Sequence, residues 1–261
     1  EIGDLLICES TYGDRLHAAD QGDAELAGAI KNSIARGGPL IIPAFALGRT
    51  QHLLYAISKL ESEGKIPVVP VFVDSPMAVE STQIYRKYSE QFDSEALALM
   101  NRGKDPLEPK ALQFSKTKDQ SKRLNSLEGP RIIISASGMA TGGRVLHHLK
   151  NWLPHPETTV LFVGYQAAGS RGEIIQSGER EVKIFGINVP VRAHVETISS
   201  LSAHADKNEL LRWAKSAHGT PRYTRIVHGE PAAISAFSST LKTNLGWDAC
   251  AAEDLEVLEI N

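Results

Sequence analysis

Short apolar runs alternate with longer amphipathic stretches in the first part of the chain. Leu5 to Cys8, Leu40 to Ile42 and Val71 to Val73 are apolar runs of strand length, each followed by turn-forming or charged residues. Residues 23–36 and 50–63 lie between them and place apolar side chains at the spacing of an amphipathic helix. This alternation predicts an α/β fold, with parallel strands joined by right-handed helical crossovers.

The same rhythm continues in the second half of the chain. Arg131 to Ser135 and Thr159 to Val163 are short and apolar enough to be central parallel strands. A helix is expected from about Asp206, where an acidic pair has the spacing of a capping box. A strand at Tyr223 to Val227 and a helix from Pro231 to Leu245 are predicted to follow.

Composition narrows the possible functions only a little. Of the 261 residues, 42% are hydrophobic and 23% are charged, which excludes a disordered chain and suffices for one large core or two smaller ones. The net charge of −3 gives no general basic field, so a nucleic-acid partner would have to bind in a local groove. Residues 91–128 are more polar, and we expect helices and loops there, at the edge of the sheet and without chemistry.

The cysteines and the first residues indicate in which cellular compartment the protein is expected. Cys8 and Cys250 lie in apolar stretches and have no CxxC or metal-ligand spacing, which favours two reduced core residues in a cytoplasmic protein. Residues 1–8 contain neither a signal peptide nor a membrane span, because Gly3 and Asp4 interrupt a short apolar run. The chain begins at Glu1, and we expect it to be a piece of a longer protein.

Glycine-rich turns follow two of the predicted strands. SASGMATGGR comes after Ile134 and GYQAAGSRG after Val163, and such loops can offer main-chain N–H groups to phosphate. A plain connector explains the first turn equally well, and neither turn matches GxGxxG or a P-loop. Assuming that the two strands are neighbours, we expect the turns to line one side of a groove for a phosphate backbone. The candidate residues are Ser137, Gly138, Gly142, Gly143, Ser170 and Arg171.

The histidines differ in their sequence surroundings. His204 in SAHAD and His228 in VHGE lie at element ends, where a side chain can face a cleft, and His194 is intermediate. A single histidine without partners at ligand spacing is more often structural than functional. On that ground the others are expected to be structural residues on helix surfaces or loops: His17, His52, His147, His148, His155 and His218.

Seven motifs, taken in order, resemble those of a known family. They are ESTYGDR, PAFALGRTQ, VFVDSPMA, ISASGMATGGR, GYQAAGSRG, SAHAD and HGE. Together they closely resemble the β-CASP branch of the metallo-β-lactamase superfamily, RNA-processing nucleases that include the endonuclease subunit of the eukaryotic mRNA 3′-end cleavage complex. The compact spacing is most similar to that of a bacterial member. The resemblance implies a doubly wound, mainly parallel β-CASP sheet plus the C-terminal portion of a metallo-β-lactamase αββα domain.

The resemblance also implies roles for three residues. The acidic motif of the family falls on Glu9, its first histidine motif on His204 and its second, a metal ligand, on His228. In the family the acid at the strand end faces the histidine that corresponds to His204. Such a pairing favours the protonated imidazole and fixes its orientation, which suits a general acid for a leaving oxygen.

The chain departs from the family pattern in its metal ligands. The family has an H-x-H-x-D-H signature, a further His and an Asp before the acidic motif, and this chain contains none of them. Zinc needs three or four protein ligands, so we expect two zinc or manganese ions only in a full-length protein and no stoichiometric metal in this chain alone. Residues 1–13 and 199–261 are expected to belong to the metallo-β-lactamase domain, and residues 14–198 to form the β-CASP domain.

Two functions remain open. The first is a fragment of a metal-dependent ribonuclease that acts in RNA processing or decay. The second is a non-catalytic scaffold or RNA-clamping subunit of the same superfamily. Retention of Glu9, His204 and His228 together favours the ribonuclease. In either case the expected partner is RNA rather than a membrane, and self-association into a homo-oligomer stays open.

Overall fold

The chain folds into two compact units. The computed structural model describes residues 3–17 and 21–260. One unit comprises residues 1–20 and 202–261, and the other comprises residues 21–201. The expected domain boundaries lie a few residues before these divisions, and the expected first segment begins with residues 1 and 2, which lie outside the described residues. No helix in the described part of the chain is long and apolar enough to cross a membrane.

The larger unit, residues 21–201, is built on a six-stranded sheet with the strand order β4-β3-β5-β2-β6-β9. All neighbouring strands in this sheet are parallel, so the predicted α/β class with a mainly parallel sheet is confirmed. The strands are β2 (Pro39–Pro43), β3 (Val71–Val73), β4 (Leu112–Phe114), β5 (Arg131–Ser135), β6 (Thr159–Val163) and β9 (His194–Ile198).

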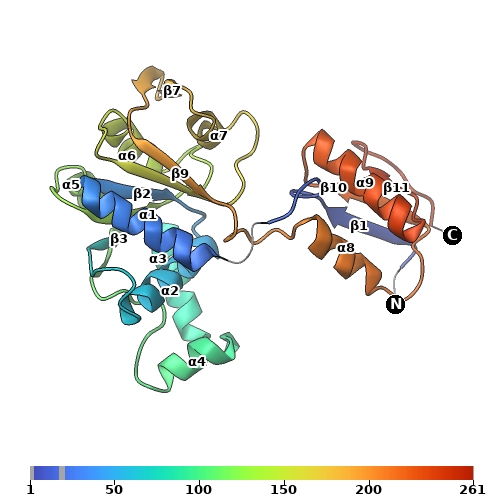
Figure 1. Cartoon of the computed structure of the whole chain (residues 1–261), viewed down its shortest axis with the longest axis horizontal. Helices are drawn as coiled ribbons and strands as arrows, with labels where there is room; N and C mark the ends of the chain where they lie inside the picture. The colour runs from blue at the N-terminus through green and yellow to red at the C-terminus, as the bar shows by residue number, and fades with distance from the viewer. Residues whose placement is uncertain (1–2, 18–20, 261) are drawn as a thin grey trace. The chain divides into compact units, whose positions relative to one another are not determined.

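Helices cover both faces of this sheet (Figure 1). Leu40 and Ile42 of β2 pack with the helices of one face, whereas Ile41 packs with those of the other, because side chains alternate along a strand. The first face carries α1 (Gly22–Arg36), α2 (Arg49–Ser62) and α3 (Pro76–Lys87). The second carries α5 (Lys118–Leu124), α6 (Val145–Trp152) and α7 (Arg171–Gln176).

Three details differ from the expectations. Residues 91–128 contain not only helices, including α4 (Ser94–Met100), but also the edge strand β4, which follows a one-turn 3₁₀ helix, η1 (Ser89–Gln91), and α4 in the chain. An antiparallel hairpin, β7 (Glu181–Ile184) and β8 (Ile187–Pro190), buries Val182, Ile184 and Val189 against the second face. Cys250 is exposed, so the prediction of two core cysteines holds for Cys8 alone.

The smaller unit contains a parallel three-stranded sheet with the order β1-β10-β11. Its helices pack on one face, where Cys8 and Ile226 meet Leu210 and Phe237. On the other face Ile7 is 60% exposed. The elements are β1 (Leu5–Glu9), α8 (Lys207–Lys215), β10 (Tyr223–Val227), α9 (Pro231–Leu245) and β11 (Ala249–Ala251).

Candidate functional site

The ends of two parallel strands bring an acid and a histidine together in the smaller unit. Glu9, the last residue of β1, pairs in register with Val227, the last residue of β10, so His228 follows directly beside it. His204 lies in the loop that leads into α8. Glu9, His204 and His228 each present one donor atom, and these atoms lie within 4.8 Å of one another.

The carboxylate of Glu9 is held between the main chain and an imidazole. Its Oε2 accepts a hydrogen bond of 2.7 Å from the main-chain N–H of Thr11, and its Oε1 lies 3.4 Å from Nδ1 of His204. The side chains of both Glu9 and His204 stay partly exposed. Because Nδ1 faces the carboxylate, Nε2 is the ring nitrogen left to meet a substrate.

Thr11 is a member of the site that the sequence reasoning missed. Its hydroxyl donates to the carbonyl oxygen of His228 at 3.0 Å and lies 3.0 Å from Nδ1 of His228 and 3.3 Å from Nδ1 of His204. The two imidazole rings stack with their centroids 5.1 Å apart. One buried hydroxyl thus fixes both histidines, and its only signal in the sequence is a threonine two positions after the acid at the strand end.

The loop that carries His228 has a backbone conformation that few residues can adopt. His228 has φ 52°, in the left-handed region that residues other than glycine rarely adopt. At Gly229, a Cβ atom would lie 2.3 Å from the hydroxyl oxygen and 2.8 Å from the carbonyl oxygen of Ser10. The glycine of HGE therefore allows the loop to approach the end of β1, and backbone strain of this kind is typical of functional sites.

A second layer of contacts holds the loop of His204. Asp206 and Glu209 form the predicted capping box at the start of α8. Burial opposes ionisation of Asp206, but hydrogen bonds from the main-chain N–H groups of Glu209 and His17 keep its pKa below the usual range. Nε2 of His17 lies 2.8 Å from the carbonyl oxygen of His204. His17 therefore has the structural role predicted for it, and it supports the site through the main chain of His204.

Two of these three donors, Glu9 and His204, already contact each other, which leaves the group short of a complete zinc centre. Zinc in proteins has three or four ligands at about 2.0–2.3 Å, and a two-metal centre needs more. In the described ranges, Glu9, His204 and His228 are the only group of His, Cys, Asp or Glu side chains close enough to hold a metal. Glu9 is already hydrogen-bonded to the main chain and faces His204. No chemical step through a metal can be derived from these residues alone.

The two glycine-rich turns lie in the larger unit and contact each other. The expectation that they follow neighbouring strands is wrong, because β2 lies between β5 and β6. The turns nevertheless touch: the N–H of Gly172 donates to the carbonyl oxygen of Met139 at 3.0 Å, and the side-chain amide of Gln166 donates to that of Gly138 at 3.2 Å.

The polar groups in these turns form hydrogen bonds within the turns and to the neighbouring strand β7. The guanidinium of Arg171 donates to the carbonyl oxygens of Lys183 at 2.7 Å and Thr141 at 3.1 Å. The hydroxyl of Ser170 caps α7, and that of Ser137 accepts hydrogen bonds from main-chain N–H groups of its own loop. They fix the shape of both turns, and a role in RNA binding stays a prediction.

Two of the candidate glycines are constrained differently. Gly143 has φ 77°, and a Cβ atom there would lie 2.3 Å from the carbonyl oxygen of Ala136, so only glycine fits. A Cβ atom on Gly138 would meet the ring of Phe45 at 3.0 Å. Phe45 itself is 53% exposed in the loop after β2, beside the first turn.

A second pairing of histidine with carboxylate is buried in the larger unit. Asp74, which follows β3, accepts hydrogen bonds from Nε2 of His148 at 2.7 Å, the hydroxyl of Ser121 at 2.5 Å and the guanidinium of Arg144 at 2.8 Å. Nδ1 of His148 lies 2.8 Å from the side-chain oxygen of Asn125. Burial opposes ionisation of Asp74, yet these hydrogen bonds keep its pKa below the usual range. His148 is structural as predicted, but fully buried rather than on a helix surface.

Two family models match the chain. The Beta-Casp domain matches residues 50–175, which lie within the larger unit. The Zn-dependent metallo-hydrolase RNA specificity domain matches residues 188–252, which begin in β8 and end just after β11. The second match includes His204 and His228, and Glu9 lies outside both.

Curated relatives are similar to this chain over most of its length. The chain is 37% identical over 242 residues to ribonuclease TTHA0252 of Thermus thermophilus, and 33% identical over 241 residues to an RNase J-like protein of Methanocaldococcus jannaschii. It is 30% identical over 248 residues to the transcription termination factor FttA of the latter organism. These matches cover 92%, 91% and 92% of this chain but only 54%, 55% and 39% of the relatives, so the chain spans about half or less of their length. The chain belongs to the β-CASP family of metallo-β-lactamase-fold proteins.

Proposed function

We propose that the protein hydrolyses phosphodiester bonds of RNA and that Glu9 and His204 act together as its proton donor. The observation that carries this proposal is the contact of 3.4 Å between Oε1 of Glu9 and Nδ1 of His204 at the open end of two strands. A carboxylate beside one ring nitrogen fixes the orientation of the imidazole and leaves the other nitrogen for proton transfer. His204 would then protonate the leaving oxygen.

His228 is proposed as a metal ligand in the intact protein. Its ring lies beside His204 and on Thr11, and the family model that covers it describes a Zn-dependent metallo-hydrolase. Because the described donors do not complete a zinc site, we expect this chain alone to hold well under one zinc or manganese ion per molecule by elemental analysis. Stoichiometric metal in the chain alone would contradict this expectation.

RNA is proposed to bind along the turns after β5 and β6. The glycines and the mutual hydrogen bonds of these turns leave a fixed main-chain surface, and the exposed ring of Phe45 offers a face on which a base could stack. Arg171→Ala should weaken RNA binding alike for all sequences, since it contacts the phosphate backbone or shapes the loop that does. Unchanged affinity in a low-salt titration would remove Arg171 from this surface.

The two units of the chain are proposed to belong to two different domains. We assign the larger unit to the β-CASP domain and the smaller one to the metallo-β-lactamase domain. The exposed Ile7 on the uncovered sheet face supports one layer of a two-layer domain. We place the protein in the cytoplasm because its cysteines are free and its proposed substrate is RNA.

The test compares the intact gene product with its His228→Ala variant. We expect the intact protein to cleave an end-labelled, unstructured RNA, and the variant to lose both cleavage and bound zinc while it still binds RNA. His218→Ala, which removes an exposed histidine of the same unit, is the matched control and should change neither. RNA binding without cleavage by the metal-loaded intact protein would instead establish a clamp or scaffold.

A further inference from the structure

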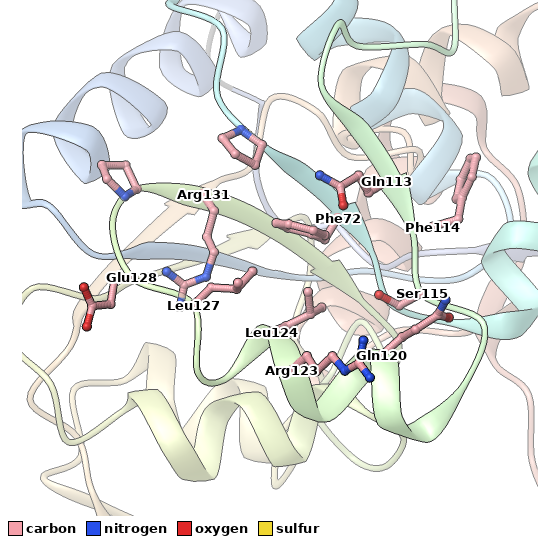
Figure 2. A pocket seen from close by; sticks show the side chains of 12 residues that line it. Phe72, Gln113, Phe114, Ser115, Gln120, Arg123, Leu124, Leu127, Glu128 and Arg131 are labelled. Carbon is pink, nitrogen blue, oxygen red and sulfur yellow. The ribbon is translucent and has the colours of Figure 1, made fainter.

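A pocket of about 480 Å³ opens on the second face of the six-stranded sheet (Figure 2). Its floor follows from strand register: Gln113 of β4 pairs with Phe72 of β3, which pairs with Ile133 of β5, so these side chains form one row. Arg131 lies two residues before Ile133 and hence on the same face. The short helix α5 covers this row only in part, through a small cluster of Phe72, Leu124 and Ile133.

The walls of the pocket are mostly apolar, and the polar groups are few. Gln113, Ser115, Gln120 and the exposed Glu128 line it together with two arginines, Arg123 and Arg131. The volume lies in the range of small-molecule sites, which combine apolar walls with a few polar anchors. The apolar lining comes from Pro70, Phe72, Phe114, Leu124, Leu127 and Pro130.

Arg131 is the unusual group in this pocket. The residue is only 3% exposed, and its Nη1 donates to the carbonyl oxygen of Gly129 at 2.6 Å, but its Nε and Nη2 have no hydrogen-bond partner in the described part of the chain. Figure 2 shows the guanidinium beside Leu127, at the pocket. Buried arginine donors are normally satisfied, because an unpaired buried donor is costly.

The known contacts of Arg131 do not satisfy these two donors. The guanidinium carbon lies 4.8 Å from the centre of the Trp152 ring, a cation–π contact that supplies no hydrogen-bond acceptor in the guanidinium plane. Nε and Nη2 point along one edge within that plane, where a carboxylate or phosphate binds with two parallel hydrogen bonds. Among the described residues no acidic side chain forms an ion pair with Arg131.

We propose that this pocket binds a small organic anion with a flat apolar body, whose carboxylate or phosphate accepts from Nε and Nη2 of Arg131 while the ring lies against Phe72 and Leu124. The proposed nuclease site, which lies in the smaller unit, involves none of these atoms. The anion supplies the missing acceptors for the buried guanidinium, and the ring fills the apolar space beside them. Neutral molecules of the same shape lack the acceptor charge and bind weakly.

The first experiment uses this chain and two ligands of matched shape. Isothermal titration calorimetry with 1-naphthoate should detect binding, and 1-naphthamide, the neutral counterpart, should bind at least about tenfold more weakly, as expected for loss of a charged hydrogen bond. Adenosine monophosphate and inorganic phosphate, titrated in parallel, show whether a nucleotide or an aromatic carboxylate is the better fit. Equal binding of the acid and the amide, or no binding of any probe at millimolar concentration, overturns the proposal.

The second experiment assigns the binding to Arg131. Arg131→Met keeps the length of the side chain but removes its charge, and should weaken naphthoate binding by at least about tenfold. Arg131→Lys keeps a charge without the two-pronged edge and should lie between wild type and Arg131→Met. Arg123→Gln removes the same charge from the exposed rim of the pocket and should change affinity by less than about threefold. If Arg123→Gln weakens binding as much as Arg131→Met, general charge attraction explains the result and the proposal fails. The comparison of naphthoate with naphthamide on wild type needs no variant to fold.

Discussion

The chain contains two pairings of histidine with carboxylate that share their chemistry and differ in their surroundings. Asp74 and His148 are fully buried, lie 2.7 Å apart and have hydrogen-bond partners on all sides. Glu9 and His204 are partly exposed and lie 3.4 Å apart, and their contact uses only Nδ1 of the His204 ring. The first pair is enclosed by its own hydrogen-bond partners, whereas the second pair is held by the main chain and remains partly exposed to solvent. Burial and saturation with partners therefore separate the structural pair from the candidate proton donor.

The largest effect is expected at the partly exposed pair, Glu9 and His204. In the intact protein, His204→Ala should lower the single-turnover rate of RNA cleavage by about 10²–10⁴-fold, the usual range for loss of a positioned general acid. Metal content and the unfolding midpoint should hardly change, because the ring is partly exposed and caps no helix. His155→Ala removes a histidine from an exposed pair with Glu157 and serves as the control, for which wild-type cleavage is expected.

The second effect is expected at the buried pair, Asp74 and His148, and concerns stability. Asp74→Ala leaves His148, Ser121 and Arg144 without their common acceptor and should lower the free energy of unfolding by about 2–5 kcal/mol, as measured by urea denaturation. Substitution of the exposed Glu157 by Gln should have no measurable effect on stability. If Asp74→Ala unfolded at the same urea concentration as wild type, the network would not hold the larger unit together.

The pH dependence of this loss has a definite sign. The pKa of Asp74 is lowered in the folded state, so its stabilisation is complete above the pKa of an unfolded aspartate, about 3.9, and is lost as the pH falls through the lower folded value. The stability difference between wild type and Asp74→Asn should therefore shrink below about pH 4. A difference that grows in acid would show that the carboxyl is protonated in the folded protein.

The sequence predicted regular elements well where hydrophobic period and length agreed. The strands at 131–135, 159–163 and 223–227 and the helix at 231–245 have the predicted bounds. The edge strand β4 escaped notice because an alternation over only three residues is too short to indicate a strand, which is defined here by its pairing with β3. Strand order was likewise hidden, since no local pattern states that β2 separates β5 from β6.

From the sequence, only those site residues could be predicted whose side-chain type and neighbouring residues already indicate chemistry. Glu9, His204 and His228 were named from motifs and do come together, although their roles remain proposals. Thr11 and His17 were missed because their function depends on distances across the chain, 193 positions from Thr11 to His204 and 187 from His17 to His204. His148 shows the converse: the sequence HHLK does not reveal which of two adjacent histidines turns inward toward Asp74.

A smaller effect sharpens the comparison by asking whether Glu9 and His204 act as a unit. Glu9→Gln keeps the side-chain shape but removes the charge that faces Nδ1 of His204, so it should reproduce much of the His204→Ala defect in single-turnover cleavage. Combining both changes should cost far less than the product of the separate effects, as for residues that act together. Rates that multiply independently would leave Glu9 as a structural acid that holds the N–H of Thr11.

The smallest predicted effect concerns the hydroxyl groups that serve the two pairs. Thr11→Val keeps the shape of a buried side chain but removes the hydroxyl between His204 and His228, and it should lower cleavage by about threefold to tenfold, the equivalent of one ordinary hydrogen bond. Ser121→Ala removes the corresponding hydroxyl from the buried network and should lower the unfolding free energy by about 1 kcal/mol without slowing cleavage. Thr11→Val is thus expected to change the rate of cleavage, and Ser121→Ala the stability of the fold. Wild-type cleavage by Thr11→Val would mean that Glu9 orients His204 without help, and that the hydroxyl of Thr11 serves the fold of the HGE loop alone.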